Sequence, residues 1–227
     1  MIAPLWEGGG PVGELVLRST NALQGGVNWA RGYEGNSLNF PGTAGDIVDL
    51  PFPSRELRSA TFCYRFRHDQ VALARLGAHN DAEFILRTNG SIWADICNNG
   101  SIKSGAGLYE ANTWHILHGV WNKDAGYAHL YVDGVFVKGT TTLVTPPSPT
   151  FVRLGASPTT STQTLVGDIS FAGLWNHDWN AQQIARHAAD PWGMFRPERR
   201  PTRSVPAAGG GLSIPVAMHS YRQRRAA

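Results

Sequence analysis

Short segments in which apolar and polar residues alternate follow one another along most of this chain. In Thr61–Arg67, for example, every second residue is aromatic, and Cys63 and Arg65 lie between the rings. A period of two places alternate side chains on opposite faces of a β-strand, so this segment is predicted to be a strand with one buried face. Further strands, bounded by turn residues, are predicted at 37–40, 46–50, 83–87, 91–97, 114–122, 127–132, 135–138, 152–155 and 165–175.

Two pairs of turn residues predict how some of these strands pair. Asn89-Gly90 and Asp133-Gly134 each stand between two of the predicted strands. Residue pairs of these types tolerate the positive φ angles of tight two-residue hairpins. The strands on either side of each pair are therefore expected to be antiparallel neighbours.

One segment near the C-terminal end has helical rather than strand signals. Asn180 is suited to the N-cap position, and Gln183 stands three residues later, as in a capping box. Ile184 lies on the apolar face, and Pro191 closes the segment. A helix is therefore predicted over 180–189.

Composition agrees with a protein made mostly of strands and turns. The chain has 227 residues with 26 glycines, 14 prolines and 16% charged residues, too few charges for a solvated helical or disordered protein. This length accommodates one all-β domain with extensions. We therefore predict an all-β fold, a two-sheet antiparallel jelly-roll sandwich with one short C-terminal helix and an extended basic C-terminal arm.

A series of short motifs along the chain resembles the concanavalin A-like lectin/glucanase superfamily, in particular its laminin-G-like domains. The resemblance covers roughly residues 15–192, and the hairpin that ends in Tyr-Val-Asp-Gly is its most specific part together with the strands before and after it. The matching motifs, in chain order, are Ser37–Gly42, Asp46–Leu50, Ala60–Phe62, Thr113–His115, Ala128–Gly134, Leu154-Gly155, Gly167–Ile169 and Asp190-Pro191.

The resemblance implies a two-sheet jelly roll over residues 1–195, with a core at 15–192 and a basic arm at 196–227. It does not imply one function, because this fold carries lectins, glycanases and adhesion modules. The segment Trp192–Pro197 and the basic arm after it also resemble laminin-G-like proteins encoded near phage and prophage structural genes.

No pair of acidic residues has the pattern of a glycosidase on this fold. A retaining glycosidase needs two carboxylates about 5–5.5 Å apart, and the glucanase branch carries them as Glu-x-Asp-x-Glu on one strand, which this sequence lacks. The nearest pairs are Asp46 with Asp49 and Asp81 with Glu83. These are interpreted as strand ends and rim residues, so the protein is predicted not to be an enzyme.

No metal or other cofactor is predicted. His115, His118 and His129 could approach one another if their strands pair, but the alternation along 127–132 is expected to place His129 on the opposite face. Calcium bound by loop oxygens is kept as an alternative, with Asn80, Asp81 and Asp46 as candidate ligands. The two cysteines, Cys63 and Cys97, are expected to be reduced rather than paired.

Exposed aromatic rings are the surfaces on which sugar rings stack, and three residues are candidates for this role. Trp93, Trp121 and Tyr127 are the glycan-facing candidates. Trp93 alternates with Ile92 and Ala94, which favours a position on the face away from the core. The competing interpretation is that these rings pack inside the sandwich.

The basic character of the chain lies in its C-terminal arm. Seven arginines and one glutamate give residues 196–227 a formal charge of +6, which leaves −3 for the rest of a chain whose total is +3. A short apolar segment within the arm is predicted to add as an edge strand to a neighbouring sheet, while the arginines pair with acidic groups. The residues of this assembly arm are Leu212, Ile214, Val216, Met218, Arg222, Arg224 and Arg225.

These features favour a non-catalytic, phage-like virion structural protein, such as a decoration or fibre protein, anchored in an assembly through the arm. Its expected partners are other copies of itself, a capsid or tail protein, and cell-surface glycans; nucleic acid and membrane are not expected. The expected location is the virion, assembled in the host cytoplasm, because no signal peptide or membrane span is recognised. The alternative is a carbohydrate-binding adhesion module, and a glycan hydrolase is the third hypothesis.

Overall fold

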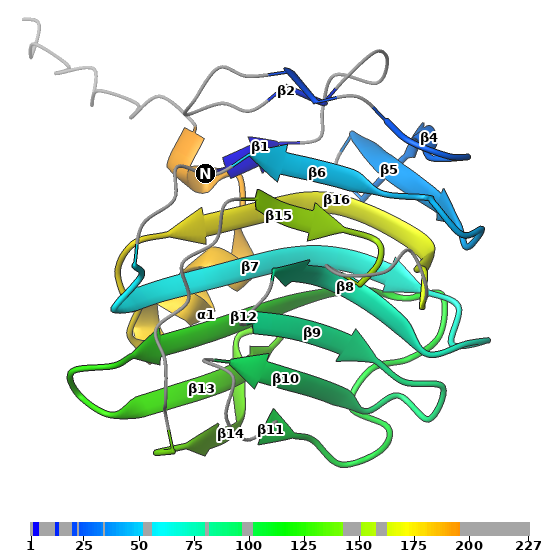
Figure 1. Ribbon diagram of the computed structural model, residues 1–227. Helices are drawn as coiled ribbons and strands as arrows, with labels where there is room; N and C mark the ends of the chain where they lie inside the picture. Colours follow the sequence, from blue (N-terminus) through cyan, green and yellow to red (C-terminus); the bar gives the residue numbers. More distant parts are fainter. Residues whose placement is uncertain are drawn as a thin grey trace, which may run out of the picture. The chain divides into compact units, whose positions relative to one another are not determined.

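Two antiparallel β-sheets stacked face to face form the body of the protein (Figure 1). The structure is a computed structural model that describes residues 2–4, 12–13, 20–21, 23–33, 35–51, 56–79, 82–96, 102–142, 151–157 and 163–195. Every strand pairing among these residues is antiparallel, and a single α-helix accompanies the sheets. The all-β jelly-roll prediction is therefore confirmed.

The larger sheet, here called sheet I, has eight strands in the order β14-β13-β12-β7-β16-β5-β4, with β1 also paired to β16. Its strands are β1 (Ile2–Pro4), β4 (Asn28–Arg31), β5 (Asn36–Pro41), β7 (Ser59–His68), β12 (Trp114–Asn122), β13 (Tyr127–Val132), β14 (Val135–Thr140) and β16 (Val166–Trp175).

The smaller sheet, sheet II, has six strands in the order β11-β10-β9-β8-β15-β6. Its strands are β6 (Val48–Pro51), β8 (Ala74–His79), β9 (Ala82–Leu86), β10 (Ile92–Ile96), β11 (Ile102–Lys103) and β15 (Phe151–Leu154). Two further short strands, β2 (Val12–Gly13) and β3 (Thr20–Asn21), pair with each other.

The core lies between the two sheets and is built from the alternate residues that the sequence pattern selects. On β7, Phe62, Tyr64 and Phe66 are buried and point towards sheet II, where Phe84 of β9 meets Phe62 edge to face at 5.7 Å between ring centroids. Each large apolar side chain that is fully buried contributes about 1.5–3 kcal/mol. The period-two pattern therefore identified the inner face of this strand correctly.

Both predicted hairpins are present. Gly90 has φ +72° in the turn between β9 and β10, and Asp133 and Gly134 have φ +51° and +80° in the turn between β13 and β14. Asp133 is the only non-glycine residue in these two turns with positive φ among the described residues, and aspartate tolerates that conformation better than most residues.

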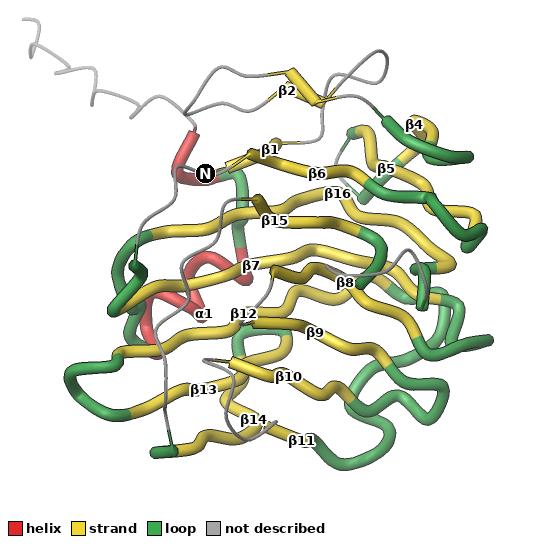
Figure 2. Tube along the Cα trace, in the orientation of Figure 1, coloured by secondary structure: helices red, strands yellow, loops and turns green. Residues whose placement is uncertain are grey.

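The helix α1 (Ala181–Ala189) covers part of the outer face of sheet I, the face turned away from sheet II (Figure 2). Its start agrees with the prediction: the Asn180 side chain accepts the Gln183 backbone N–H, and the Gln183 side chain accepts the Asn180 N–H, both at 2.9 Å. Ile184 packs against Val120 and Tyr131 on the strands below it. Where the helix covers it, as at Cys63, β7 is buried on both faces.

The chain divides into two compact units, Met1–Pro191 and Trp192–Ala227. In the second unit the described residues include a 3-10 turn, Gly193–Phe195. The ring centroids of Trp192 and Phe195 lie 6.0 Å apart. The predicted assembly arm at 196–227 lies outside the described residues. Among those residues, α1 is too short to cross a lipid bilayer and no other helix is longer.

Candidate functional site

Trp93 lies on the outer face of sheet II, flanked by two cationic side chains. It alternates on β10 with the buried residues Ile92 and Ala94, so its indole points away from the core. The Arg87 guanidinium lies 4.0 Å and the Lys103 ammonium 4.4 Å from the ring centroid. These cations come from the strands that flank β10: Arg87 directly follows β9, and Lys103 belongs to β11. The predicted outward position of Trp93 is confirmed.

A row of acidic and basic groups lies on the same face beside Trp93. Asp95 is opposite Glu83 in the pairing of β10 with β9, and Arg75 of β8 forms an ion pair with Glu83. Burial raises the pKa of Asp95, an effect that the charge of Arg75 opposes. Asp95 Oδ1 is buried and has no hydrogen-bond partner among the described residues. The sequence did not reveal this carboxylate pair, because its members stand on different strands.

The geometry of that pair does not suit glycoside hydrolysis. A retaining mechanism needs one protonated and one ionised carboxyl group, both facing the same glycosidic bond. Here the Glu83 carboxylate forms an ion pair with Arg75, and Asp95 Oδ1 is buried. Asp81, the partner considered for Glu83 from the sequence, lies outside the described residues.

The prediction that Trp121 faces glycans is wrong. Trp121 is fully buried between the sheets, and its indole N–H donates to the backbone carbonyl of Leu57 at 2.9 Å. It lies on the same face of β12 as Leu117, which belongs to the core cluster. Both faces of β12 carry large apolar residues, so alternation alone could not decide which face points inwards.

Tyr127 lies on the outer face of sheet I, and therefore on the opposite side of the sandwich from Trp93. Its ring stacks on His129 at 4.5 Å between centroids, and its hydroxyl donates to the Asp178 carboxylate. The Tyr127 ring is half-buried, and the His129 ring covers one of its faces. The structure thus does not bring the three predicted aromatic residues together on one surface.

A cluster of three buried side chains lies beneath α1. Cys63 and His118 are opposite each other on β7 and β12, and His187 of α1 reaches down to both. His118 Nε2 and His187 Nδ1 are 2.9 Å apart, and the free thiol Sγ of Cys63 is 3.7 Å from His187 Nδ1. Burial lowers the pKa of both histidines, to about 4 for His187, and raises the pKa of the Cys63 thiol.

This cluster offers the only set of three or more candidate metal ligands among the described residues, with its ligand atoms within 4.8 Å of one another. His129 does not join it. The sequence-based argument placed His129 on the opposite face; in fact His118 and His129 share the outer face of sheet I, but His129 stacks on Tyr127. His118 Nδ1 and His187 Nε2 are buried and have no hydrogen-bond partner among the described residues, whereas metal-bound histidines normally donate that second N–H to an acceptor.

Of the three candidate calcium ligands, only Asp46 lies within the described residues, and its carboxylate is committed to the backbone. It is fully buried and accepts hydrogen bonds from the backbone N–H groups of Gly26 and Thr43, each at 2.6 Å. Asp46 therefore ties two loops together, which explains why β6 starts at Val48, two residues later than predicted. Asn80 and Asp81 lie outside the described residues.

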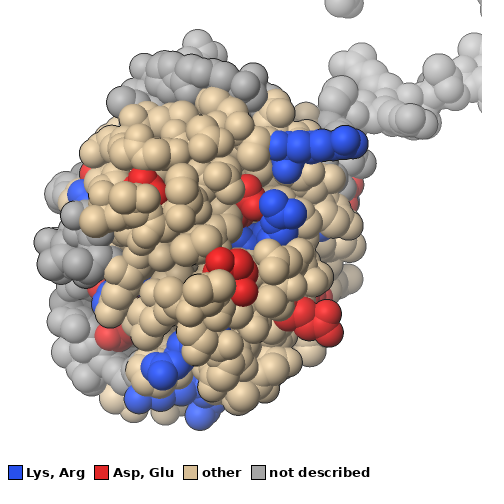
Figure 3. Space-filling view, turned by 90° about the vertical axis from the view of Figure 1, so that its right-hand side faces the viewer, with Lys and Arg blue, Asp and Glu red and all other residues tan. Residues whose placement is uncertain are grey.

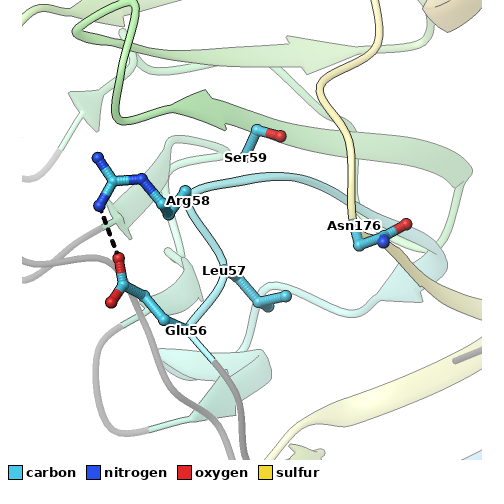
Figure 4. Close-up of a pocket in the computed structure, with 5 residues that line it drawn as sticks. All are labelled: Glu56, Leu57, Arg58, Ser59 and Asn176. Atoms are coloured by element: carbon cyan, nitrogen blue, oxygen red, sulfur yellow. Dashed lines mark hydrogen bonds and ion pairs between the residues drawn. The ribbon is translucent and has the colours of Figure 1, made fainter.

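A shallow hollow of about 200 Å³ lies at the surface and is lined by Glu56, Leu57, Arg58, Ser59 and Asn176 (Figure 4). Arg58 is paired with Glu56 and with Asp124, so its charge is already matched. Charges of both signs are scattered over the side of the molecule in Figure 3 and do not gather into a patch. Neither the hollow nor this distribution of charges indicates a deep substrate pocket.

Two antiparallel sheets stacked as a jelly roll are the architecture of the lectin-like fold. Residues 42–185 match the family model described as the concanavalin A-like lectin/glucanases superfamily. The chain therefore belongs to this superfamily, as the sequence motifs suggested. No curated protein matches the sequence.

Several solved structures share the fold at low sequence identity. A pentraxin from Limulus polyphemus is 14% identical with a TM-score of 0.55, over 67% of this chain and 81% of its own. A sialidase module from Ruminococcus gnavus, bound to α2,3 sialyllactose, is 10% identical with a TM-score of 0.51, over 59% and 84%. Domain 4 of an arabinanase from Geobacillus stearothermophilus, in complex with arabinotriose, is 15% identical with a TM-score of 0.56, over 72% and 82%.

Proposed function

We propose that this protein is a non-catalytic carbohydrate-binding module that holds a glycan on the outer face of sheet II, with Trp93 as the stacking surface. The observation that carries the proposal is the outward indole between two cationic hydrogen-bond donors. A pyranose ring presents an apolar C–H face, which stacks on an aromatic ring, and a rim of hydroxyl groups, which need polar partners.

The groups around Trp93 supply both requirements. Lys103 is exposed and stands on the two-residue edge strand β11, so its ammonium can leave the indole face and bond a sugar hydroxyl instead. Arg87 donates from the opposite flank. Glu83, which is paired with Arg75, and Asp95 follow on the same face and extend this polar rim along the sheet. Two solved structures that share this fold hold oligosaccharides, which supports a glycan as the ligand.

A glycan array with the full chain, followed by titration calorimetry with the best oligosaccharide, tests the proposal. Trp93→Ala is expected to weaken binding tenfold or more, because one buried aromatic contact contributes about 1.5–3 kcal/mol. Trp93→Phe should retain most of the affinity. Tyr127→Ala is the matched control, since it removes a half-buried ring on the other sheet.

Absence of any glycan ligand on the array would refute the function. Equal affinity of wild type and Trp93→Ala would refute the site. The role in a virion that the sequence favoured stays a prediction, because it depends on arm residues outside the described part of the chain.

A further inference from the structure

Arg65 is a nearly buried cation that has no hydrogen-bond or ion-pair partner in the part of the chain that the structure describes. It is 9% exposed, on the outer face of β7, and it forms no ion pair within 4.0 Å and no hydrogen bond among the described residues; its Nε is buried and unpartnered. The carboxylate of Asp133 is near enough for the charge of Arg65 to lower its pKa, but its oxygens already accept from His115 Nδ1 at 2.7 Å and the Ile116 N–H at 2.9 Å. A buried guanidinium without acceptors is costly, so a protein rarely keeps one without a use.

An exposed aromatic ring covers this guanidinium. The ring of Tyr33 lies 3.6 Å from Arg65 Cζ, and Tyr33 is 52% exposed, so one ring face rests on the cation and the other is open to solvent. Trp114 of β12 meets Tyr33 edge to face at 6.3 Å between centroids. The two rings thus form an aromatic corner, in which Tyr33 lies over the Arg65 guanidinium and the Trp114 ring centroid lies 5.5 Å from Arg67 Cζ.

A second guanidinium beside this corner is held in a fixed position. Arg67 donates from Nε and Nη2 to Asp168 Oδ2 at 2.8 and 2.6 Å, and Asn39 donates to the other carboxylate oxygen at 3.1 Å. The Asp168 side chain is 2% exposed and that of Arg67 is 39% exposed. Arg67 Nη1 has no partner among the described residues and remains available to a ligand.

We propose that Arg65, Arg67, Tyr33 and Trp114 form a second ligand site, on sheet I, for a saccharide that carries a carboxylate. The Nε of Arg65 and the Nη1 of Arg67 have no acceptor among the described residues, so the site offers unsatisfied N–H donors to a ligand carboxylate. Arginine forks match carboxylates in two-point hydrogen bonds. The aromatic corner provides the apolar surface on which the pyranose ring stacks.

Trp93 and this second site lie on opposite sheets, so their ligands are tested separately. The probes are trigalacturonate and 3′-sialyllactose, with their neutral counterparts, the trigalacturonate methyl ester and lactose, and acetate as a carboxylate without a ring. Calorimetry with the full chain should show at least one acidic probe binding ten times more tightly than its neutral counterpart and than acetate, and 0.5 M salt should weaken that binding.

Variants then assign the binding to the site. Tyr33→Ala and Arg67→Gln should each weaken it at least tenfold, whereas Arg58→Gln, which alters an exposed and paired arginine, should leave it unchanged. Arg65→Met should abolish binding and raise the midpoint of thermal unfolding, because it removes an unpaired buried charge. A purely structural role for Arg65 predicts a lower midpoint instead.

The proposal is overturned if neither acidic probe binds better than its neutral counterpart, if acetate alone binds as tightly, or if Tyr33→Ala and Arg67→Gln leave affinity unchanged. Glu34 follows Tyr33 in the sequence and lies outside the described residues. Glu34→Gln should keep the affinity within threefold. A gain of more than tenfold would mean that this carboxylate is the internal partner of Arg65, which also overturns the proposal.

Discussion

Mild acid should destabilise this protein through the histidine pair under α1. His187 is 5% exposed and its pKa lies at about 4, because burial and then the charge of Arg65 disfavour the protonated form. In the unfolded chain the imidazole has a pKa near 6.5. The unfolded state therefore binds a proton that the folded state does not, and stability falls as pH drops from about 6.5 towards 4.

The size of the effect follows from the two pKa values. Between pH 7.5 and pH 5, one histidine with these values costs about 2 kcal/mol of unfolding free energy by proton linkage. His118 is fully buried and its pKa is also well below the ordinary value, because of burial and then His187, so it adds a loss of the same sign. The carboxylates with lowered pKa values do not oppose this change, since they titrate below pH 4.

Urea unfolding at pH 7.5, 6 and 5 measures this loss directly. His187→Leu removes one of the two titrating groups, so its stability should fall between pH 7.5 and pH 5 by about 2 kcal/mol less than that of the wild type. His177→Gln is the control, because it changes an exposed histidine and keeps an acceptor for the Trp179 indole N–H. The reasoning fails if His187→Leu and wild type lose the same free energy.

Four further outcomes are expected. Trp121→Ala should lower the unfolding free energy by about 3–5 kcal/mol in urea titrations, since it leaves a cavity in the core and an unpaired Leu57 carbonyl. Asn180→Ala should cost about 0.5–2 kcal/mol in the same assay, because the capping box is lost. Neither wild type nor Glu83→Gln should release reducing sugar from β-glucans; turnover in wild type alone would reveal a catalytic pair. Deleting residues 204–227 should leave a folded domain that no longer self-associates in light scattering, and unchanged association would show that the arm plays no part.

Local sequence signals determined much of the fold. The aromatic residues of Thr61–Arg67 identified the inner face of β7, because a strand's side chains alternate whatever its neighbours are. The turn at Asn89-Gly90 and the capping box of Asn180 and Gln183 could also be recognised in the sequence. The contacts that define each of them join residues only a few positions apart. Trp93 was placed correctly since only one face of β10 is apolar.

Only the tertiary structure decided which residues meet across the sheets. Trp121 belongs to a strand with apolar residues on both faces, and the inner face is chosen by the packing of sheet II on one side and α1 on the other. The Cys63–His118–His187 cluster and the corner of Arg65, Tyr33 and Trp114 each join separate segments of the chain. Alternation along a strand specifies that its two faces differ, but strand order and register, which are long-range properties, specify what each face touches.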